Sequence, residues 1–175
     1  VQGFHGGHVW SEQPKHVRTG SGRQRLNILG ALHATKLGLF SLTTTDYISA
    51  PTVVELLEFL RQNHPGRSLS VVLDNARYQR CDLVRRAAKR YRINLVFLPH
   101  YSPNLNLIER FWKFMKKTAL AGVYHEMKQA FLMAANQFID EVNDGIHHEA
   151  LATLLTLEFQ VLKDDREIFT SCARA

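Results

Sequence analysis

Hydrophobic residues change their spacing from one segment of the chain to the next, and these changes predict strands and helices. Two short apolar runs, 27–34 and 37–43, are typical of a buried strand and its hairpin partner. Apolar residues of 52–62 fall on one side of a helix that follows Pro51. Residues 64–66, His-Pro-Gly, then break the chain. The first third therefore predicts a hairpin followed by a helix.

Strand and helix patterns alternate through the middle of the chain. The apolar, β-branched run 69–73 ends at Asp74 and indicates a central strand buried on both faces. The later elements are predicted as follows: a helix over 81–92, a buried strand over 94–98, and helices over 107–118 and about 125–142. Antiparallel strands followed by strand, helix and strand predict an α/β fold, with a mixed sheet and helices on both faces.

Composition narrows the class of protein. The 175 residues are 45% hydrophobic and 22% charged, a composition that is typical of a globular domain. Because no repeat or linker divides the sequence, a single domain is predicted over 1–175. No apolar stretch approaches the roughly 20 residues that span a bilayer. Cys81 and Cys172 form no Cys-x-x-Cys pair, which favours a reduced, cytoplasmic protein. The formal charge of +6 indicates an anionic partner.

Two acidic residues occupy positions where catalytic carboxylates are found. Asp74 ends a predicted buried strand, and Glu109 lies early in a later helix. Ligands of open α/β sheets bind beyond the carboxyl ends of strands, and Mg²⁺ prefers hard oxygen donors. A metal site at Asp74 and Glu109 is therefore one interpretation.

Each acid also has a structural explanation. An Asp-Asn pair after a strand is often only a turn. Asn106 lies three residues before Glu109, as in a capping box, and Lys113 lies four residues after it, as in a helical ion pair. Spacing alone leaves both interpretations open.

The residues around the two acids form a more specific sequence pattern. Residues 72–77 read Val-Leu-Asp-Asn-Ala-Arg, and residues 98–112 contain Tyr-Ser-Pro-Asn-Leu-Asn-Leu-Ile-Glu. With 34 residues between Asp74 and Glu109, positions 75 to 108, these segments resemble the catalytic core of bacterial insertion-sequence transposases of the mariner superfamily. The segments 23–32 and 154–160 also look like this family.

This resemblance implies an RNase H-like fold whose Asp-Asp-Glu triad holds two Mg²⁺ or Mn²⁺ ions. One ion would activate water or a DNA 3′ hydroxyl, and the other would stabilise the leaving oxygen. The resemblance further implies cleavage of transposon ends, strand transfer into target DNA, a homodimer, and action at the bacterial nucleoid.

The chain departs from the family pattern in two ways. The family's first Asp lies a few residues before the segment that matches 8–10, so this ligand and an upstream DNA-binding module are expected to precede the chain. Asp46 falls after the third family strand, where the family has a loop, and we assign it no catalytic role. Asn104 and Leu107 replace an acid and a Pro that are common in the family signature.

Basic residues near the two acids are candidates for contacts to DNA phosphates, although a solvated basic face would have the same pattern. The DNA-binding candidates are Arg77, Arg80, Arg85, Arg86, Lys89, Arg90, Lys113, Lys116 and Lys117. Other basic residues are less specific: a stretch of unknown orientation at Lys15, Arg18, Arg23 and Arg25, and His100 beside the signature. Trp112 is interpreted as a packing residue, and a zinc site at His5, His8, His147 and His148 is discounted.

Two rival functions remain. A catalytically inactive, truncated or domesticated transposase copy would bind DNA without holding metal at Asp74 and Glu109. A cellular RNase H-like nuclease, such as a junction resolvase, would share the fold, but the signature and the acid spacing count against it. An Asp on the first strand upstream would favour the enzyme over the inactive copy.

Overall fold

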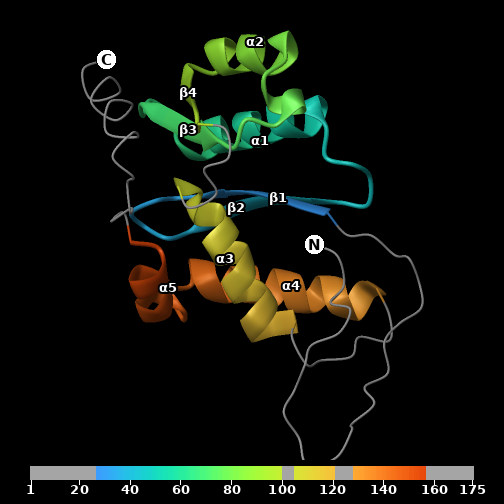
Figure 1. Cartoon of the computed structure of the whole chain (residues 1–175), viewed down its shortest axis with the longest axis vertical. Coiled ribbons are helices and arrows are strands. Elements are labelled where there is room, and N and C mark those ends of the chain that lie inside the picture. The colour runs from blue at the N-terminus through green and yellow to red at the C-terminus, as the bar shows by residue number, and fades with distance from the viewer. Residues whose placement is uncertain (1–26, 100–104, 121–127, 157–175) are drawn as a thin grey trace, which may run out of the picture.

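The computed structural model describes residues 27–99, 105–120 and 128–156. Figure 1 shows α1 and α2 with strands β3 and β4 on one side of the molecule, and α3, α4 and α5 on the other, with the β1–β2 hairpin crossing between them. The elements are β1 (Asn27–Leu32), β2 (Leu39–Thr44), α1 (Ala50–Asn63), β3 (Leu69–Leu73), the short 3-10 helix η1 (Arg77–Gln79), α2 (Asp82–Arg90), β4 (Ile93–Phe97), α3 (Leu107–Met115), the π-helical turn η3 (Lys116–Leu120), α4 (Lys128–Asn143) and α5 (His148–Leu154).

The strands form two separate pairs. β1 and β2 are antiparallel, with Leu32 opposite Leu39, whereas β3 and β4 are parallel, with Leu73 opposite Phe97. The parallel pair requires a crossover, which α2 provides. The α/β prediction and the antiparallel hairpin are therefore confirmed. Among the described strands, the two pairs are not joined into the predicted single mixed sheet.

One hydrophobic core, here called the upper core, lies between α1, α2 and one face of the β3–β4 pair. It is built from small and aliphatic residues: Val53, Leu57, Val84, Ala87, Ala88 and Ile93 are buried, and Leu69, Val71 and Leu95 pack against them. The prediction that 69–73 is buried on both faces is wrong, because Val72 is 57% exposed on the opposite face of β3. A five-residue apolar run does not reveal how many of its faces neighbouring elements cover.

Arg61 holds the loops around the upper core together. Its guanidinium donates hydrogen bonds to four backbone carbonyls: Tyr91 (2.7 Å), His64 (2.9 Å), Arg67 (2.8 Å) and Arg92 (2.9 Å). These carbonyls belong to the loop after α1 and to the turn between α2 and β4, so one side chain fixes both connections. The planar fork of an Arg suits this arrangement, since it presents five donors in fixed directions.

A second core, the lower core, lies between the β1–β2 hairpin and helices α3, α4 and α5. It is richer in aromatic residues, with Phe111 fully buried and its ring 6.2 Å from that of Phe138. Trp112 packs against this core, as predicted, and lies directly over Gly30 of β1. A Cβ on Gly30 would stand 2.9 Å from Cζ2 of Trp112, so only glycine permits this close approach of α3 to the strand.

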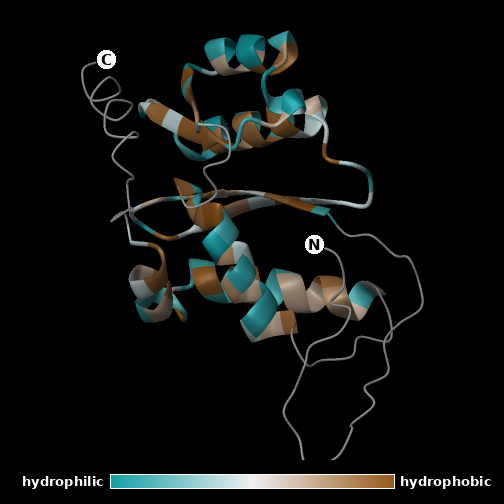
Figure 2. Ribbon diagram, in the orientation of Figure 1, coloured by the Kyte–Doolittle hydropathy of each residue, from teal (hydrophilic) through white to brown (hydrophobic). Residues whose placement is uncertain are grey.

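In the lower half, a side chain also forms hydrogen bonds with the backbone at one edge of the hairpin. The side chain of Asn143, the last residue of α4, accepts a bond from the Leu39 N–H at 2.8 Å and donates to its carbonyl at 3.1 Å. The amide thus pairs with β2 as a neighbouring strand would. Figure 2 shows hydrophobic colour along β3 and much of α4, whereas much of α2 is hydrophilic in this view.

Helix positions agree well with the predicted ranges, with differences at the ends. α1 begins at Ala50, so Pro51 lies in its first turn rather than before it. α2 buries Val84, Ala87 and Ala88, but Leu83, expected on the same face, is 43% exposed. α3 ends at Met115 and continues as η3, and α5 was not predicted. The start of the helix predicted from 125 lies outside the described residues.

Candidate active site

Asp74 follows β3 directly, at the end of the parallel strand pair. Beside it, the Leu98 N–H donates to the Leu73 carbonyl at 2.9 Å, so the two strands remain joined up to this point. One carboxylate oxygen, Oδ1, accepts a hydrogen bond from the Ala76 N–H at 3.3 Å, and the side chain is exposed. Asp74 is therefore part of a turn, and this turn leaves the carboxylate accessible from solvent.

The residue after Asp74 has an unusual backbone. Asn75 has φ 77°, in the left-handed region that Asn tolerates better than most residues. Its side-chain Nδ2 donates to the Leu98 carbonyl at 2.7 Å, and its Oδ1 accepts a hydrogen bond from Nε of Arg80. The turn after β3 is thus fastened to the end of β4. Sequence reasoning did not find this role, for which the only signal was an Asn placed directly after the acid.

Tyr78 and Gln79 of η1 lie close to Asp74. Burial raises the pKa of the Tyr78 phenol above its usual value near 10, and the negative charge of Asp74 raises it further, while a hydrogen bond from Gln79 acts in the opposite direction. Gln79 is only 6% exposed, and within the described structure its Oε1 has no hydrogen-bond partner. The turn that carries the exposed Asp74 is therefore followed by a partly buried Tyr and a buried Gln.

Glu109 lies in the first turn of α3 and is half-buried. The N-cap residue Asn106 makes no side-chain capping bond, so the capping-box explanation of Glu109 is wrong. Among the described residues, no ion pair joins Glu109 to Lys113 either. A carboxylate near a helix N-terminus is favoured by the exposed N–H groups there. The helix therefore accommodates Glu109, while neither of its expected side-chain partners holds it.

Asp74 and Glu109 offer carboxylate oxygens, the type of ligand that a divalent metal binds. The elements that carry them pack in different cores. Asp74 follows a strand of the upper core, and Glu109 lies on the helix that carries Phe111 of the lower core. Carboxylate oxygens suit Mg²⁺ and Mn²⁺, so the residue types fit such an ion. Within the described ranges, no group of three or more His, Cys, Asp or Glu residues is placed to hold a metal.

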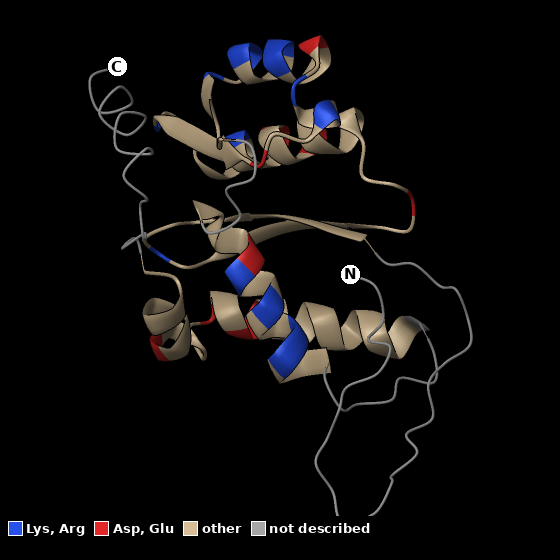
Figure 3. Cartoon of the chain, in the orientation of Figure 1, with Lys and Arg blue, Asp and Glu red and all other residues tan. Residues whose placement is uncertain are grey.

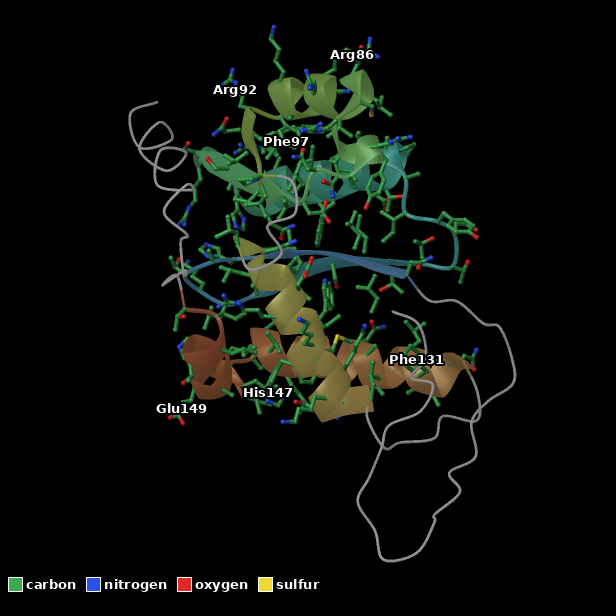
Figure 4. All side chains as sticks on the ribbon, in the orientation of Figure 1. Arg86, Arg92, Phe97, Phe131, His147 and Glu149 are labelled. Carbon is green, nitrogen blue, oxygen red and sulfur yellow. The ribbon has the colours of Figure 1, made fainter. Side chains whose placement is uncertain are left out.

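The predicted DNA-binding residues fall on two different surfaces. Four of these cations are exposed on α2: Arg85, Arg86, Lys89 and Arg90. None of the four forms an ion pair with a described residue. Figure 3 shows this basic side of α2 facing outward, whereas the lysines of α3 and η3 lie in the other half of the molecule. Arg86 is labelled on the outer side in Figure 4.

The remaining DNA-binding candidates differ in exposure. Lys113 and Lys117 are exposed, Lys116 is half-buried, and Arg77 is exposed on η1. Arg80 donates to Asn75 and also lies over the Phe97 ring, with 6.0 Å between Cζ and the ring centroid. Arg80 is thus held against the protein although its side chain is exposed.

Two other residues considered in the sequence, Asp46 and His147, take part in structural contacts. Asp46 is exposed in the turn after β2, where its carbonyl accepts a bond from Asn27 at 2.8 Å. His147 pairs with Glu141 at 2.9 Å and stacks on Phe138, so it belongs to the lower half (Figure 4). Several candidates lie outside the described residues: His5, His8, Lys15, Arg18, Arg23, Arg25, His100, Asn104, Cys172 and the segment 157–160.

Comparison with known proteins identifies the family of the chain. A family model described as a DDE superfamily endonuclease matches residues 7–131, which include both Asp74 and Glu109. A comparison with curated proteins found no match. Within the described ranges, no helix has both the length and the apolar character needed to cross a bilayer. Since the family model covers well over half of the chain, the protein belongs to the DDE superfamily endonucleases.

Proposed function

We propose that this chain is the catalytic domain of a DNA transposase, which cleaves transposon ends and joins them to target DNA. Family membership implies a transposase-type nuclease that acts on DNA, and enzymes of this superfamily use divalent metals. The observation that carries the proposal is the position of Asp74, accessible at the carboxyl end of a parallel strand pair within the matched region. The mariner-type acid spacing and the Tyr-Ser-Pro signature support the finer assignment.

Asp74 and Glu109 would hold the metal. Two Mg²⁺ or Mn²⁺ ions, when bound, supply an activated oxygen nucleophile and stabilise the leaving oxygen of a phosphodiester. The contribution of the protein is to present the carboxylates: Asp74 from a turn fixed to β4, and Glu109 from the first turn of α3. The RNase H-like sheet, with helices on both faces, is part of this proposal.

The exposed cations would contact the DNA backbone. A protein that neutralises phosphates releases counterions, so affinity falls steeply as salt rises. We therefore expect weak binding that depends little on DNA sequence, with contributions from α2 and from Lys113, Lys116 and Lys117. Tight, sequence-selective binding at physiological salt would contradict this expectation. A homodimer that holds two transposon ends at the bacterial nucleoid completes the proposal.

A Mn²⁺ titration by calorimetry would test the metal site. The variants are Asp74→Asn and Glu109→Gln, which keep the side-chain shape but remove the charge. Asp82→Asn, at the exposed start of α2, is the matched control. We expect saturable binding that is lost in both site variants and retained in the control. A folded chain that binds no Mn²⁺, or that binds equally well without either acid, would contradict the proposal.

The alternative function is that of a catalytically inactive, domesticated copy that binds DNA. The observation that favours this alternative is that, within the described ranges, no group of three or more His, Cys, Asp or Glu residues is placed to hold a metal. Retention of salt-dependent DNA binding without Mn²⁺ binding or DNA nicking would support it. Mn²⁺-dependent nicking of a duplex that is lost in Asp74→Asn would support the enzyme instead.

A further inference from the structure

The turn between β3 and η1 is held by a chain of side-chain hydrogen bonds. Asp74 Oδ1 accepts from the Ala76 N–H, Asn75 donates to the Leu98 carbonyl, and Arg80 donates to Asn75. The Leu98 carbonyl lies just beyond β4, 23 residues away in the sequence. The turn that carries Asp74 is therefore bound to a neighbouring strand end and does not depend on its local sequence alone.

Asn75 combines two properties that a single other residue rarely offers. Its φ of 77° directs the chain away from β3, and Gly could adopt the same angle. Its amide also donates one hydrogen bond, to the Leu98 carbonyl, and accepts another, from Arg80. Gly would keep the backbone but lose both bonds, so the two properties can be separated by mutation.

Arg80 helps to hold the Asn75 side chain in place. Its Nε donates to Asn75, and its guanidinium lies over the ring of Phe97, the last residue of β4. Figure 4 labels Phe97 on this side of the molecule. Contacts on two sides hold the planar group against the protein, although the Arg80 side chain is exposed.

We propose that Asn75 is a positioning residue, which, supported by Arg80, holds the Asp74 carboxylate in place by fastening its turn to the end of β4. This inference rests on the proposed function, in which Asp74 is a metal ligand. Residues that orient a metal ligand commonly change metal affinity about 10- to 100-fold when they are replaced.

The test uses the full chain, labelled with ¹⁵N, and the variant Asn75→Gly. The matched control is Asn63→Gly: Asn63 also donates its side-chain amide to a carbonyl at 2.8 Å, that of Phe59, but at the end of α1. The readouts are the thermal midpoint, the Mn²⁺ affinity by calorimetry, and the hydrogen-exchange protection of the Ala76 amide relative to the intrinsic rate of each sequence.

In Asn75→Gly we expect a folded protein whose Ala76 amide loses protection from hydrogen exchange, because its bond to Asp74 loosens, and whose Mn²⁺ affinity falls about tenfold. Asn63→Gly should lower the midpoint without either change. Unchanged protection of Ala76, or an equal loss of affinity in the control, would overturn the inference. If the wild-type chain binds no Mn²⁺, the metal proposal fails, and the protection of Ala76 still decides whether Asn75 positions Asp74.

Arg80→Lys tests the contribution of Arg80 to this positioning. Lys keeps the charge but lacks the planar fork, so it cannot reproduce the bond to Asn75 and the contact with Phe97 together. We expect a smaller loss of Ala76 protection and of Mn²⁺ affinity than in Asn75→Gly. Protection and affinity equal to those of the wild type would contradict the role of Arg80.

Discussion

The two halves of the molecule are stabilised in different ways. The lower core relies on large side chains, with Phe111, Phe138 and Trp112 packed between α3, α4 and the hairpin. The upper core is made of small aliphatic residues, and side-chain bonds to backbone carbonyls hold its loops, from Arg61 at one end and Asn75 at the other. Both halves bury a hydrophobic core, but the lower half relies more on large aromatic side chains and the upper half more on side-chain hydrogen bonds to its loops.

This difference matters because each half contributes one of the two acids. Asp74 depends on the fastened turn of the upper half, whereas Glu109 depends on the packing of α3 in the lower half. α1 connects the halves, since it packs in the upper core and its Phe59 ring lies 5.8 Å from Phe40 of β2. The relative position of the acids therefore depends on both kinds of stabilisation.

The largest expected effect comes from the packed half. Phe111→Ala removes a fully buried ring and should cost about 3–5 kcal/mol of unfolding free energy, through lost burial and the cavity left behind. Chemical denaturation measures the loss, and hydrogen exchange shows whether the β3–β4 amides stay protected. Phe111→Leu, which removes less volume, should cost less. Equal costs for the two variants would mean that this ring is not packed as described.

Arg61→Ala tests the side-chain hydrogen bonds that hold the loops of the upper half. Four carbonyls lose a charged donor, and at least some remain partly buried, so we expect a loss of about 2–3 kcal/mol. Hydrogen exchange should show the opening in the loops around α2 and not in α4. Arg67→Ala, an exposed neighbour, should change the stability by less than about 0.5 kcal/mol. A similar small effect for Arg61→Ala would show that these bonds contribute little.

Gly30→Ala tests the contact that seats α3 on the hairpin. The added methyl would overlap the Trp112 ring and should cost about 1–3 kcal/mol through overpacking. In a Trp112→Phe background, which removes the far end of the ring, the same substitution should cost less. A double-mutant cycle by denaturation measures this coupling. Additive effects would contradict the close contact between Gly30 and Trp112.

The smallest effect is a change of titration in the upper half. The Asp74 charge adds to the raised pKa of Tyr78, so Asp74→Asn should lower that pKa toward its ordinary value near 10. Carbon NMR of the tyrosine rings measures it. Glu58→Gln is the control, because Glu58 contributes to the raised pKa of Tyr91 and should leave Tyr78 unchanged. An unchanged Tyr78 titration in Asp74→Asn would place the carboxylate farther from the ring.

Local patterns were sufficient to predict most elements of the fold. The apolar periodicity of 52–62 and 107–118 identified α1 and α3, and short β-branched runs identified β3 and β4 within one residue of their ends. These features depend on side chains that lie near one another in the chain, so the sequence contains them directly. The candidate acids were also visible, since Asp74 ends a strand and Glu109 follows a specific signature.

Long-range contacts decided the rest. The exposure of Val72 depends on which elements cover β3, and the need for glycine at Gly30 depends on a Trp about 80 residues later. The role of Asn75 depends on a carbonyl 23 residues away. The sequence by itself determined which elements form and which residues carry acidic or basic groups. Only the tertiary structure decided which of these groups are exposed, fastened or placed in separate halves, because burial and hydrogen bonding depend on partners that are distant in the chain.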